Sequence, residues 1–533
     1  MRVLIALILV QVLKLNSAEY FSSTSGLEQL LGTELVLLDE LQKYVNEIKD
    51  HAELLQSEID VIRAEHVSAA EQSHEYLNNP LNAFRLIKRL HSDWETIERS
   101  VESEASATNF LEAVTRCRQH LSYPTSDDFV GTTLALTRLQ QTYELDVAEL
   151  ASGMLQGVKY GTAMSWQDCF VLGQHLYQLR DYNNTLPWLR QSMELLLQES
   201  YSNESFSLDF VETVAGYHQS LGDHEQALQL VNHVLRVQPE QRLHLLATRA
   251  ELEQLIRDGI KQGLLHDPAL HTPNYHQSQE FKQYQQVCRE QLQPSAAAQR
   301  HLRCRLQRAK SYFNYKLEEL QSEPYIVQVH EVVSLADSLK LQQLARPGLQ
   351  RSEVYSVHGS ERISANYRTS QGTTFEYDHH PVMLKLRQHV AHLTGLNMQH
   401  AEQLQIANYG IGGHYEPHMD SFDDSYDYSE EDDTTNRIAT GIFYLSDVQA
   451  GGGTAFPFLP LLVKPERGSL LLWYNLHTSG DPDYRTRHAG CPVLQGSKWI
   501  ANVWIRLRNQ DHVRPCALES DTHLSLPFKD HKY

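Results

Sequence analysis

The stretch Tyr415-Glu416-Pro417-His418-Met419-Asp420, followed by His488 and then Lys498, decides how we interpret the C-terminal part of this 533-residue chain. In an extended segment, side chains two residues apart point to the same side, so His418 and Asp420 can reach one metal ion. A distant strand that brings His488 beside them would complete a site of two imidazoles and one carboxylate. Such a site leaves one face of the metal open, which suits non-haem Fe(II).

The spacing alone carries little weight, because the chain has 28 His. Four other His-x-Asp or His-x-Glu pairs occur, at His51/Glu53, His91/Asp93, His400/Glu402 and His414/Glu416. Context favours the pair at His418, since Lys498 follows His488 by ten residues and can hold the far carboxylate of a 2-oxo acid. A zinc hydrolase would also use two His and a carboxylate, but it would not explain this lysine.

Short β-type runs surround these residues and predict an antiparallel barrel or jelly roll. The expected strands are 325–329, 403–407, 438–445, 469–473 and 499–505, with a flanking helix at 384–393. Residues 240–320 are expected to be mostly helical, and the change to β-type composition near residue 325 marks the approach to this domain.

The N-terminal region carries a heptad pattern of apolar residues. They step alternately by three and four, and Glu34 is the one polar intrusion: Leu27, Leu31, Leu38, Leu41, Val45, Ile48, Ala52, Leu55, Ile59 and Ile62. This seam favours pairing with a second long helix and makes the region a candidate dimerisation element. The alternative is an amphipathic helix packed on its own domain. Further along, the Asn79-Pro80 start of an apolar run predicts a capped helix.

Residues 166–239 look repeated and predict two tetratricopeptide-like helical hairpins with a concave, peptide-binding face. Tyr177, Tyr182 and Tyr217 are best placed to line that face, and aromatic-lined grooves suit proline-rich extended peptides. The alternative is that these tyrosines only pack the hairpins.

Composition and the N-terminal segment favour a protein of the secretory pathway that does not bind nucleic acid. A formal charge of -21 without a sustained basic block disfavours a nucleic-acid partner. Residues 1–18 resemble a secretory signal, and no later stretch is long and apolar enough to span a membrane. The six cysteines and the glycosylation acceptors at Asn183 and Asn203 fit the secretory pathway. Sequence alone pairs none of the cysteines, and Cys117 and Cys169 stay unassigned.

Several motifs together resemble the catalytic domain of animal collagen-type prolyl 4-hydroxylase alpha subunits. They are Asn408-Tyr409-Gly410-x-Gly412-Gly413-x-Tyr415-Glu416-Pro417-His418-x-Asp420, Asn436-Arg437-Ile438-Ala439-Thr440, Trp473-Tyr474-Asn475-Leu476, Tyr484-x-Thr486-Arg487-His488-Ala489-x-Cys491-Pro492-Val493 and Lys498-Trp499. The similarity extends over nearly the whole chain. One departure is His414, where the family usually has Gln, and this imidazole has no assigned role.

The resemblance implies an Fe(II), 2-oxoglutarate and ascorbate dependent dioxygenase of the endoplasmic reticulum lumen that converts peptidyl proline to 4-hydroxyproline. His418, Asp420 and His488 would bind iron, and Lys498 would bind 2-oxoglutarate. By the same resemblance, Cys288 would pair with Cys304 and Cys491 with Cys516. The implied partners are a proline-rich or collagen-like peptide and protein disulfide isomerase, in an α2β2 tetramer.

We therefore expect a multidomain α+β protein. The division is a signal peptide at 1–18, a helical dimerisation domain at 19–140, a tetratricopeptide-like peptide-binding domain at 141–245, a helical linker at 246–335, a double-stranded β-helix dioxygenase domain at 336–510 and a tail at 511–533. Two other functions remain open at this point: a non-catalytic peptide-binding escort, and a dioxygenase acting on another residue of secreted proteins.

Overall fold

The computed structural model describes residues 23–47, 52–70, 73–101, 108–155, 157–159, 161–200, 208–237, 244–259, 274–308, 314–355, 362–364, 367–422 and 435–518. The expected signal peptide and Asn203 lie outside these residues. The chain forms two compact units, one of Met1–Tyr143 with Gln279–Tyr533 and the other of Glu144–Ser278, so the second unit interrupts the first in sequence. Among the described helices, none combines the length and hydropathy needed to cross a membrane.

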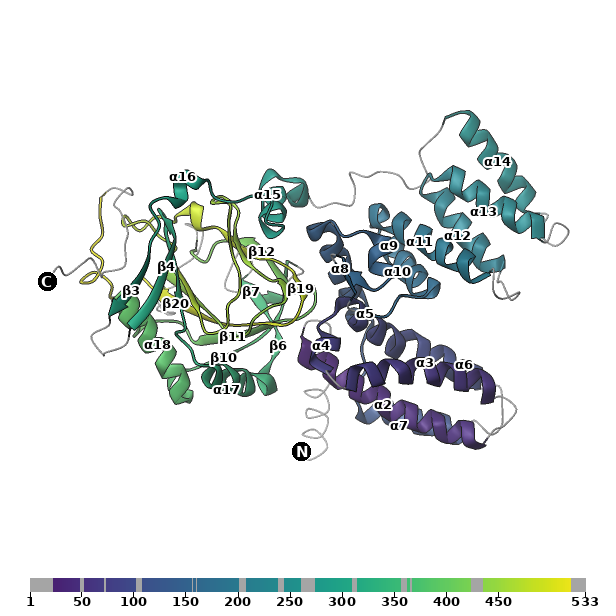
Figure 1. The fold of residues 1–533 in the computed structure, drawn as a ribbon, viewed down its shortest axis with the longest axis horizontal. Coiled ribbons are helices and arrows are strands. Elements are labelled where there is room, and N and C mark those ends of the chain that lie inside the picture. The colour runs from purple at the N-terminus through teal and green to yellow at the C-terminus, as the bar shows by residue number, and fades with distance from the viewer. Residues whose placement is uncertain are drawn as a thin grey trace, which may run out of the picture. The chain divides into compact units, whose positions relative to one another are not determined.

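Helices make up the N-terminal part of the first unit (Figure 1). They are α2 Thr24–Glu47, α3 Ala52–Ala70, α4 Ser73–Leu77, α5 Pro80–Lys88, η2 Arg89–Asp93, α6 Trp94–Val101, α7 Thr108–His120 and α8 Ser126–Tyr143. The predicted cap is confirmed, since the Asn79 side chain accepts a 2.8 Å hydrogen bond from the Leu81 amide at the start of α5. Pro80 fits this first turn because its missing N–H would have no partner there anyway.

The heptad seam is divided between two helices that pack on each other, α2 and α3. Leu27, Leu41, Ile59 and Ile62 are buried within this single chain. Their burial favours the alternative of an amphipathic seam packed on its own domain. Ile48 lies outside the described residues. Dimerisation through this region stays a prediction.

Glu34, the polar residue in the seam, anchors a buried ionic network. Arg89 donates to both of its carboxylate oxygens, at 2.5 and 2.9 Å, and His66 Nε2 lies 2.8 Å from Oε2. Arg89 also contacts Glu65, whose other oxygen lies 2.5 Å from Arg85. Burial alone would raise the pKa of Glu34, but Arg89 and His66 lower it below its ordinary value. The network thus joins α2, α3, α5 and the π-helical turn η2.

The second unit is built from helical hairpins, as the repeated sequence predicts. Its elements are α9 Val147–Ala151, β1 Met154–Leu155, β2 Val158–Lys159, α10 Trp166–Gln178, α11 Tyr182–Ser200, α12 Leu208–Ser220, α13 His224–Val237, α14 Leu245–Arg257 and η5 Asn274–Gln277. Helix α10 packs on α11, and α12 packs on α13. A shared apolar core that includes Leu189, Val214 and Leu230 runs through these hairpins. Their assignment to the tetratricopeptide class stays a prediction.

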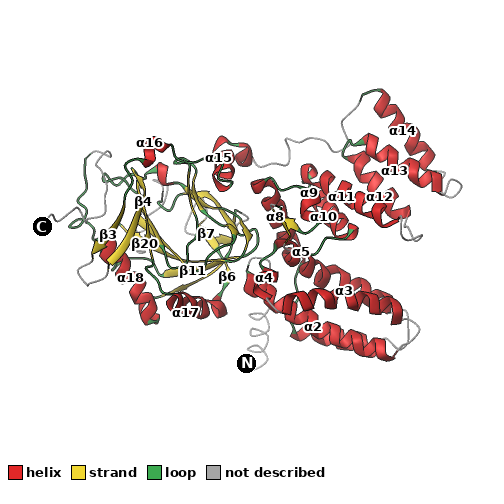
Figure 2. Cartoon of the chain, in the orientation of Figure 1, coloured by secondary structure: helices red, strands yellow, loops and turns green. Residues whose placement is uncertain are grey.

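Two antiparallel sheets form the C-terminal domain, and Figure 2 shows its strands gathered there. The nine-stranded sheet has the order β3-β4-β5-β17-β13-β20-β11-β10-β6, and the five-stranded sheet has the order β16-β15-β18-β12-β9. In the large sheet the strands are β3 Cys304–Arg308, β4 Asn314–Ser322, β5 Tyr325–His330, β6 Gln350–Arg351, β10 Gln371–Phe375, β11 Leu404–Tyr409, β13 Arg437–Tyr444, β17 Leu470–Tyr474 and β20 Lys498–Arg506. In the small sheet they are β9 Arg368–Thr369, β12 His414–His418, β15 Thr454–Phe456, β16 Leu461–Val463 and β18 His488–Gly490.

The remaining elements are two short strand pairs, β7 Glu353–Tyr355 with β8 Arg362–Ser364 and β14 Ala450–Gly451 with β19 Val493–Gln495, and the helical segments α15 Gln279–Cys288, α16 Ala296–Gln299, α17 Leu335–Ala345, η6 Arg346–Gly348, η7 Tyr377–His379, α18 Pro381–Thr394 and η8 Tyr484–Thr486. The five predicted strands and the predicted helix are confirmed as β5, β11, β13, β17, β20 and α18. The expectation that residues up to 320 are mostly helical is corrected by β3 and β4. In β4 the buried Tyr315 and Leu317 alternate with exposed neighbours, which is the period of a strand.

Apolar side chains cover both faces of the large sheet. One cluster, which includes Tyr409, Ile442 and Trp473, fills the space between the two sheets. Another joins the opposite face to α17 and α18 through residues such as Leu341 and Leu386. Strands β13 and β20 of the large sheet, which carry Thr440 and Lys498, are therefore covered on both faces.

The disulfide pairing differs from the expected one. Cys288, at the end of α15, is bonded to Cys491, with Cα atoms 5.7 Å apart, while Cys304 and Cys516 are free and exposed. The expected pairs Cys288–Cys304 and Cys491–Cys516 are thus corrected. The physical reason is that α15 packs on the small sheet, where Cys288 and Cys491 share one buried cluster. Neither Cys117 nor Cys169 forms a disulfide in the part of the chain that the structure describes.

Candidate iron and 2-oxoglutarate site

The small sheet brings the three predicted ligands together. His418 and His488 are register partners on the neighbouring strands β12 and β18, and Asp420 follows β12 by two residues. Asp420 carboxylate oxygens lie 3.8 Å from His418 Nε2 and 3.6 Å from His488 Nε2. One ligand atom from each of the three lies within 4.8 Å of the others, which fits a single metal ion. Among the described residues this is the one such group.

Backbone carbonyls fix the orientation of both imidazoles. His418 Nδ1 lies 2.9 Å from the Glu416 carbonyl oxygen, and His488 Nδ1 lies 3.0 Å from that of Thr486. These contacts place the proton on Nδ1 and leave Nε2 as the free donor atom for a metal. Burial lowers the pKa of both imidazoles, so they are held in the neutral form that binds metal. The Tyr415 ring stacks on His418 with centroids 3.5 Å apart.

Asp420 is held by a chain of hydrogen bonds from the large sheet. Thr440 donates to Asp420 Oδ2 at 2.7 Å, and Asn475 donates to the Thr440 hydroxyl at 2.9 Å. Arg437 Nη1 lies 3.8 Å from the other carboxylate oxygen. Burial alone would raise the pKa of Asp420, but His488, His418, Arg437 and the Thr440 hydrogen bond lower it to about 2. The carboxylate is therefore ionised at neutral pH, and its hydrogen bonds hold it close to the two imidazoles.

Lys498 begins β20 and reaches a small inner cavity of about 40 Å³ beside the three ligands. Its side chain is 3% exposed and makes no ion pair with any residue that the structure describes. Burial lowers its pKa to about 7. Thr454, hydrogen-bonded to Tyr444 at 2.7 Å, lines the same cavity. A buried cation without a counter-charge, next to a metal site, fits a small carboxylate ligand such as 2-oxoglutarate.

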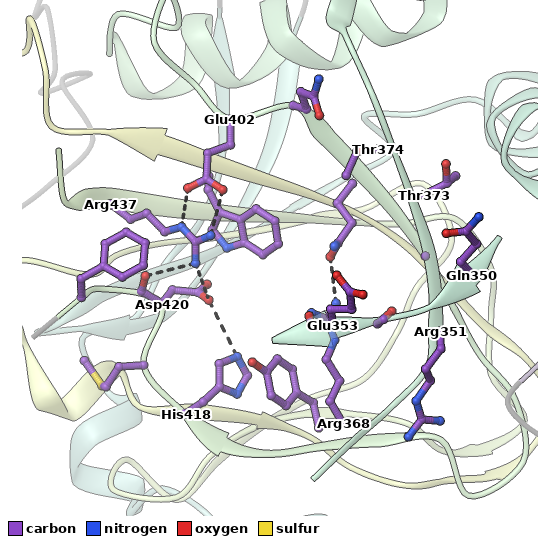
Figure 3. Close-up of a pocket in the computed structure, with 18 of the residues that line it drawn as sticks. Gln350, Arg351, Glu353, Arg368, Thr373, Thr374, Glu402, His418, Asp420 and Arg437 are labelled. Carbon is purple, nitrogen blue, oxygen red and sulfur yellow. Dashed lines mark hydrogen bonds and ion pairs between the residues drawn. The ribbon is translucent and has the colours of Figure 1, made fainter. Parts of the chain in front are cut away.

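A larger, polar groove of about 750 Å³ opens over the other side of the ligands. Figure 3 shows Arg437 lying between Glu402 and Asp420, with His418 below Asp420. Arg437 makes hydrogen bonds of 2.5 and 2.8 Å to Glu402, so the charges on this wall are paired. Across the groove, Arg368 donates to the Gln405 side chain at 2.8 Å, and its guanidinium lies over the Tyr415 ring.

The structure also brings the three predicted peptide-binding tyrosines together in the second unit. The Tyr177 ring centroid lies 5.5 Å from that of Tyr182 and 4.7 Å from that of Tyr217. All three are half-buried, and Tyr217 accepts a hydrogen bond from Gln174. Asn183, the predicted glycosylation acceptor, is exposed at the start of α11. Their roles in peptide binding and glycosylation stay predictions.

Sequence reasoning missed the residues that support the ligands. Thr440 and Asn475 lie in the motifs quoted above without an assigned role, and no sequence pattern points to Arg368. A signal did exist for Thr440, because it is a polar residue inside the apolar strand Arg437–Tyr444. Such a residue is buried only when it has a hydrogen-bond partner.

Known proteins resemble this chain along its length. Residues 23–157 match the family model "Prolyl 4-Hydroxylase alpha-subunit, N-terminal region", and residues 404–506 match the "2OG-Fe(II) oxygenase superfamily". The human prolyl 4-hydroxylase subunit alpha-1 is 33% identical over 94% of this chain and 96% of its own length. The chicken subunit alpha-1 is 34% identical over 94% and 99%, and the Caenorhabditis elegans subunit alpha-2 is 31% identical over 95% of each chain.

Among solved structures, the viral collagen prolyl hydroxylase from Paramecium Bursaria Chlorella virus-1 is 26% identical and covers 34% of this chain and 95% of that chain, with a TM-score of 0.27. The assignment of this chain to a family rests on the relatives that it matches over nearly their full length. By its full-length similarity to these alpha subunits and by its converged His418, Asp420 and His488, the chain belongs to the prolyl 4-hydroxylase alpha-subunit family.

Proposed function

We propose that this protein is a 2-oxoglutarate-dependent Fe(II) dioxygenase that converts peptidyl proline to 4-hydroxyproline. The observation that carries the proposal is the placement of Lys498 beside His418, Asp420 and His488, as a buried cation with no ion pair among the residues that the structure describes. The family name of the full-length relatives supports proline as the residue that is oxidised. A zinc hydrolase would have no use for the lysine and would release no succinate.

Each part of the site has a task in this reaction. His418, Asp420 and His488 would hold Fe(II), and Lys498 would hold the far carboxylate of 2-oxoglutarate in the inner cavity. When bound, iron and 2-oxoglutarate would allow dioxygen to oxidise a proline C–H bond while 2-oxoglutarate is decarboxylated to succinate. The Thr440–Asn475 chain keeps the Asp420 carboxylate aimed at the metal. The groove beside Arg368 and Arg437 is the surface over which a peptide would reach the ligands.

The second unit would bind the flanking peptide. A half-exposed aromatic cluster offers flat surfaces to an extended, proline-rich chain, which loses little entropy on docking. Tyr177→Ala should therefore raise the KM for a long proline-rich peptide several-fold while leaving kcat for a short peptide unchanged. Tyr275→Ala, in the same unit, is a control. Equal KM values for the Tyr177 variant and wild type would argue that the cluster only packs the hairpins.

The environment of the enzyme is also part of the proposal. We propose an endoplasmic reticulum location, ascorbate as reductant, collagen-like substrates and assembly with protein disulfide isomerase as an α2β2 tetramer. The apolar N-terminal segment and the exposed acceptor Asn183 support a lumenal protein. Co-purification from secretory-pathway extracts, with and without an isomerase subunit, would test the assembly.

The decisive experiment couples two products. The full chain, co-expressed with protein disulfide isomerase, should release succinate and form 4-hydroxyproline in a Pro-Pro-Gly peptide in equal amounts. Asp420→Asn should abolish both, and Asp511→Asn, the same substitution at an exposed position, should leave both unchanged. Absence of turnover by the wild-type complex with iron and ascorbate present would overturn the proposal. Hydroxylation of lysine in place of proline would assign a different substrate.

A further inference from the structure

Helix α8 of the N-terminal region packs directly on two loops of the oxygenase domain. One loop, Gly410 to Gly413, leads into β12, which ends at His418. The other, Cys491-Pro492, connects β18, which begins at His488, to β19, which begins at Val493. Each imidazole-bearing strand therefore has a loop in contact with α8 at one of its ends.

The first loop lies against the backbone of α8. Arg138 Nη1 donates a 2.9 Å hydrogen bond to the carbonyl of Gly412, 274 residues later in the chain. Gly412 has a φ of +60°, and a Cβ atom there would lie 2.7 Å from Ala135 Cβ and 2.9 Å from the Ala135 carbonyl oxygen. Only glycine allows this approach, so the position of the loop is set by the helix.

The second loop is held from two sides. The Tyr143 hydroxyl donates a 2.6 Å hydrogen bond to the Pro492 carbonyl, which also accepts the Gly452 amide at 3.0 Å. Next to it, Cys491 is bonded to Cys288 of α15, and α15 itself packs on α8. Tyr143 also packs on the apolar cluster that contains Ala489, the neighbour of His488.

Backbone hydrogen bonds join these two segments to each other. The Gly412 amide donates to the Val493 carbonyl at 2.9 Å, and the Val493 amide donates to the Gly413 carbonyl at 3.0 Å. A shift of either loop would therefore move β12 relative to β18. Because His418 and His488 are partners across these two strands, such a shift changes the spacing of the metal ligands.

Arg138 also interacts electrostatically with residues of β12. Burial lowers the pKa of Arg138 to about 10, so it is charged at neutral pH, and Glu416 opposes this lowering. The carbonyl of Glu416 is the group that orients His418. His414, also on β12, is buried, and burial together with Arg138 lowers its pKa to about 3. The imidazole without an assigned role is thus a neutral, buried side chain on the ligand strand.

We propose that Arg138 and Tyr143 are positioning residues for the iron site, through which the N-terminal region sets the spacing of His418 and His488. The proposal rests on the proposed iron site, because it concerns how that site is held. It means that the metal site of this chain is shared between two segments that are 274 residues or more apart. The N-terminal region is then a structural part of the oxygenase and not only an appendage to it.

Metal binding by the full-length chain tests the proposal without any turnover. Mn(II) is titrated calorimetrically into metal-free wild type, Arg138→Gln, Tyr143→Phe and the control Gln141→Ala, an exposed residue of the same helix. Both positioning variants should bind Mn(II) about tenfold more weakly, in the range found when residues that orient metal ligands are replaced. The control should bind as wild type does.

The melting temperature of each metal-free variant separates positioning from simple folding support. Tyr143→Phe removes one hydroxyl and leaves the ring in place, so it decides the matter if Arg138→Gln fails to fold. Mn(II) affinities within twofold of wild type for the folded variants, with lowered melting temperatures, would overturn the proposal. A wild-type chain that binds Mn(II) but does not hydroxylate the Pro-Pro-Gly peptide would instead refute the proposed function.

Discussion

Replacement of Lys498 by methionine should stabilise the ligand-free protein and at the same time abolish 2-oxoglutarate binding. The side chain is 3% exposed and lacks a counter-charge among the described residues, so its ammonium group is costly to bury. Methionine fills a similar volume without a charge. A residue that lowers stability in this way is retained when its charge is needed by a ligand.

The magnitude follows from the pKa of Lys498, which burial lowers from 10.5 to about 7. At about 1.4 kcal/mol for each unit of pKa, the charged form costs on the order of 5 kcal/mol, and because half of the folded protein is deprotonated at pH 7 the net cost there is about 4 kcal/mol. The unfolded chain keeps the proton up to its ordinary pKa, and the folded chain loses it near pH 7. Between these values the unfolded state binds more protons, so wild-type stability rises with pH. Below pH 7 both states are protonated, and the full cost remains.

Urea unfolding of the metal-free proteins at pH 7 and pH 9 measures this effect. Lys498→Met should exceed wild type by about 4 kcal/mol at pH 7 and by roughly half of that at pH 9. Lys385→Met, an exposed lysine 3.3 Å from Asp337, should change stability by less than about 1 kcal/mol at either pH. With Mn(II) present, 2-oxoglutarate at 100 times its Kd should add about 2.7 kcal/mol to wild type and nothing to Lys498→Met.

Two results would refute the reasoning. The first is a Lys498→Met protein that is less stable than wild type at pH 7, because the side chain would then be satisfied without a ligand. The second is a stability difference that does not shrink between pH 7 and pH 9, because the pKa of the lysine would then not be lowered.

Three further predictions concern other parts of the chain. Thr440→Val removes the hydrogen bond to the iron-site carboxylate and should weaken Mn(II) binding about tenfold in calorimetry; unchanged affinity would show that the carboxylate needs no such support. Glu34→Leu leaves the buried Arg89 guanidinium short of partners and should lower the free energy of unfolding by about 3–5 kcal/mol, read from urea titration, and an unchanged midpoint would contradict the network. Proteolysis without reduction should yield one peptide pair joined through Cys288 and Cys491; two separate local disulfides in its place would show the pairing to be wrong.

Only part of the metal site has a local signal in the sequence, and His488 and Lys498 supplied the context that singled out this pair. His418 and Asp420 are two residues apart in an extended segment, and an extended segment puts both on one side. Lys498 was a second signal, since a lysine at the start of an apolar strand indicates a role for its charge. The strand series was also readable, because β-rich runs separated by Gly and Pro leave few alternatives.

The parts that could not be predicted depend on contacts between distant segments. A period of 3.5 describes α2 and α3 equally well whether they pair with each other or with another chain, so the heptad seam could not reveal its partner. Cys288 and Cys491 are 203 residues apart, and no local pattern indicates which thiols meet. The same holds for Thr440, whose partner Asp420 becomes visible only when the two sheets face each other.

The contact between Tyr143 and Pro492 also has a consequence during synthesis. The two residues are 349 positions apart, so at ~5–20 residues per second Tyr143 is synthesised roughly 20–70 s before Pro492. The entire second unit is translated in between and can fold first. Throughout that interval the surface of α8 that faces the oxygenase is uncovered, and the nascent chain is open to aggregation or to chaperones. Expression yield of this protein should therefore depend on folding factors present during translation and not only on the stability of the finished fold.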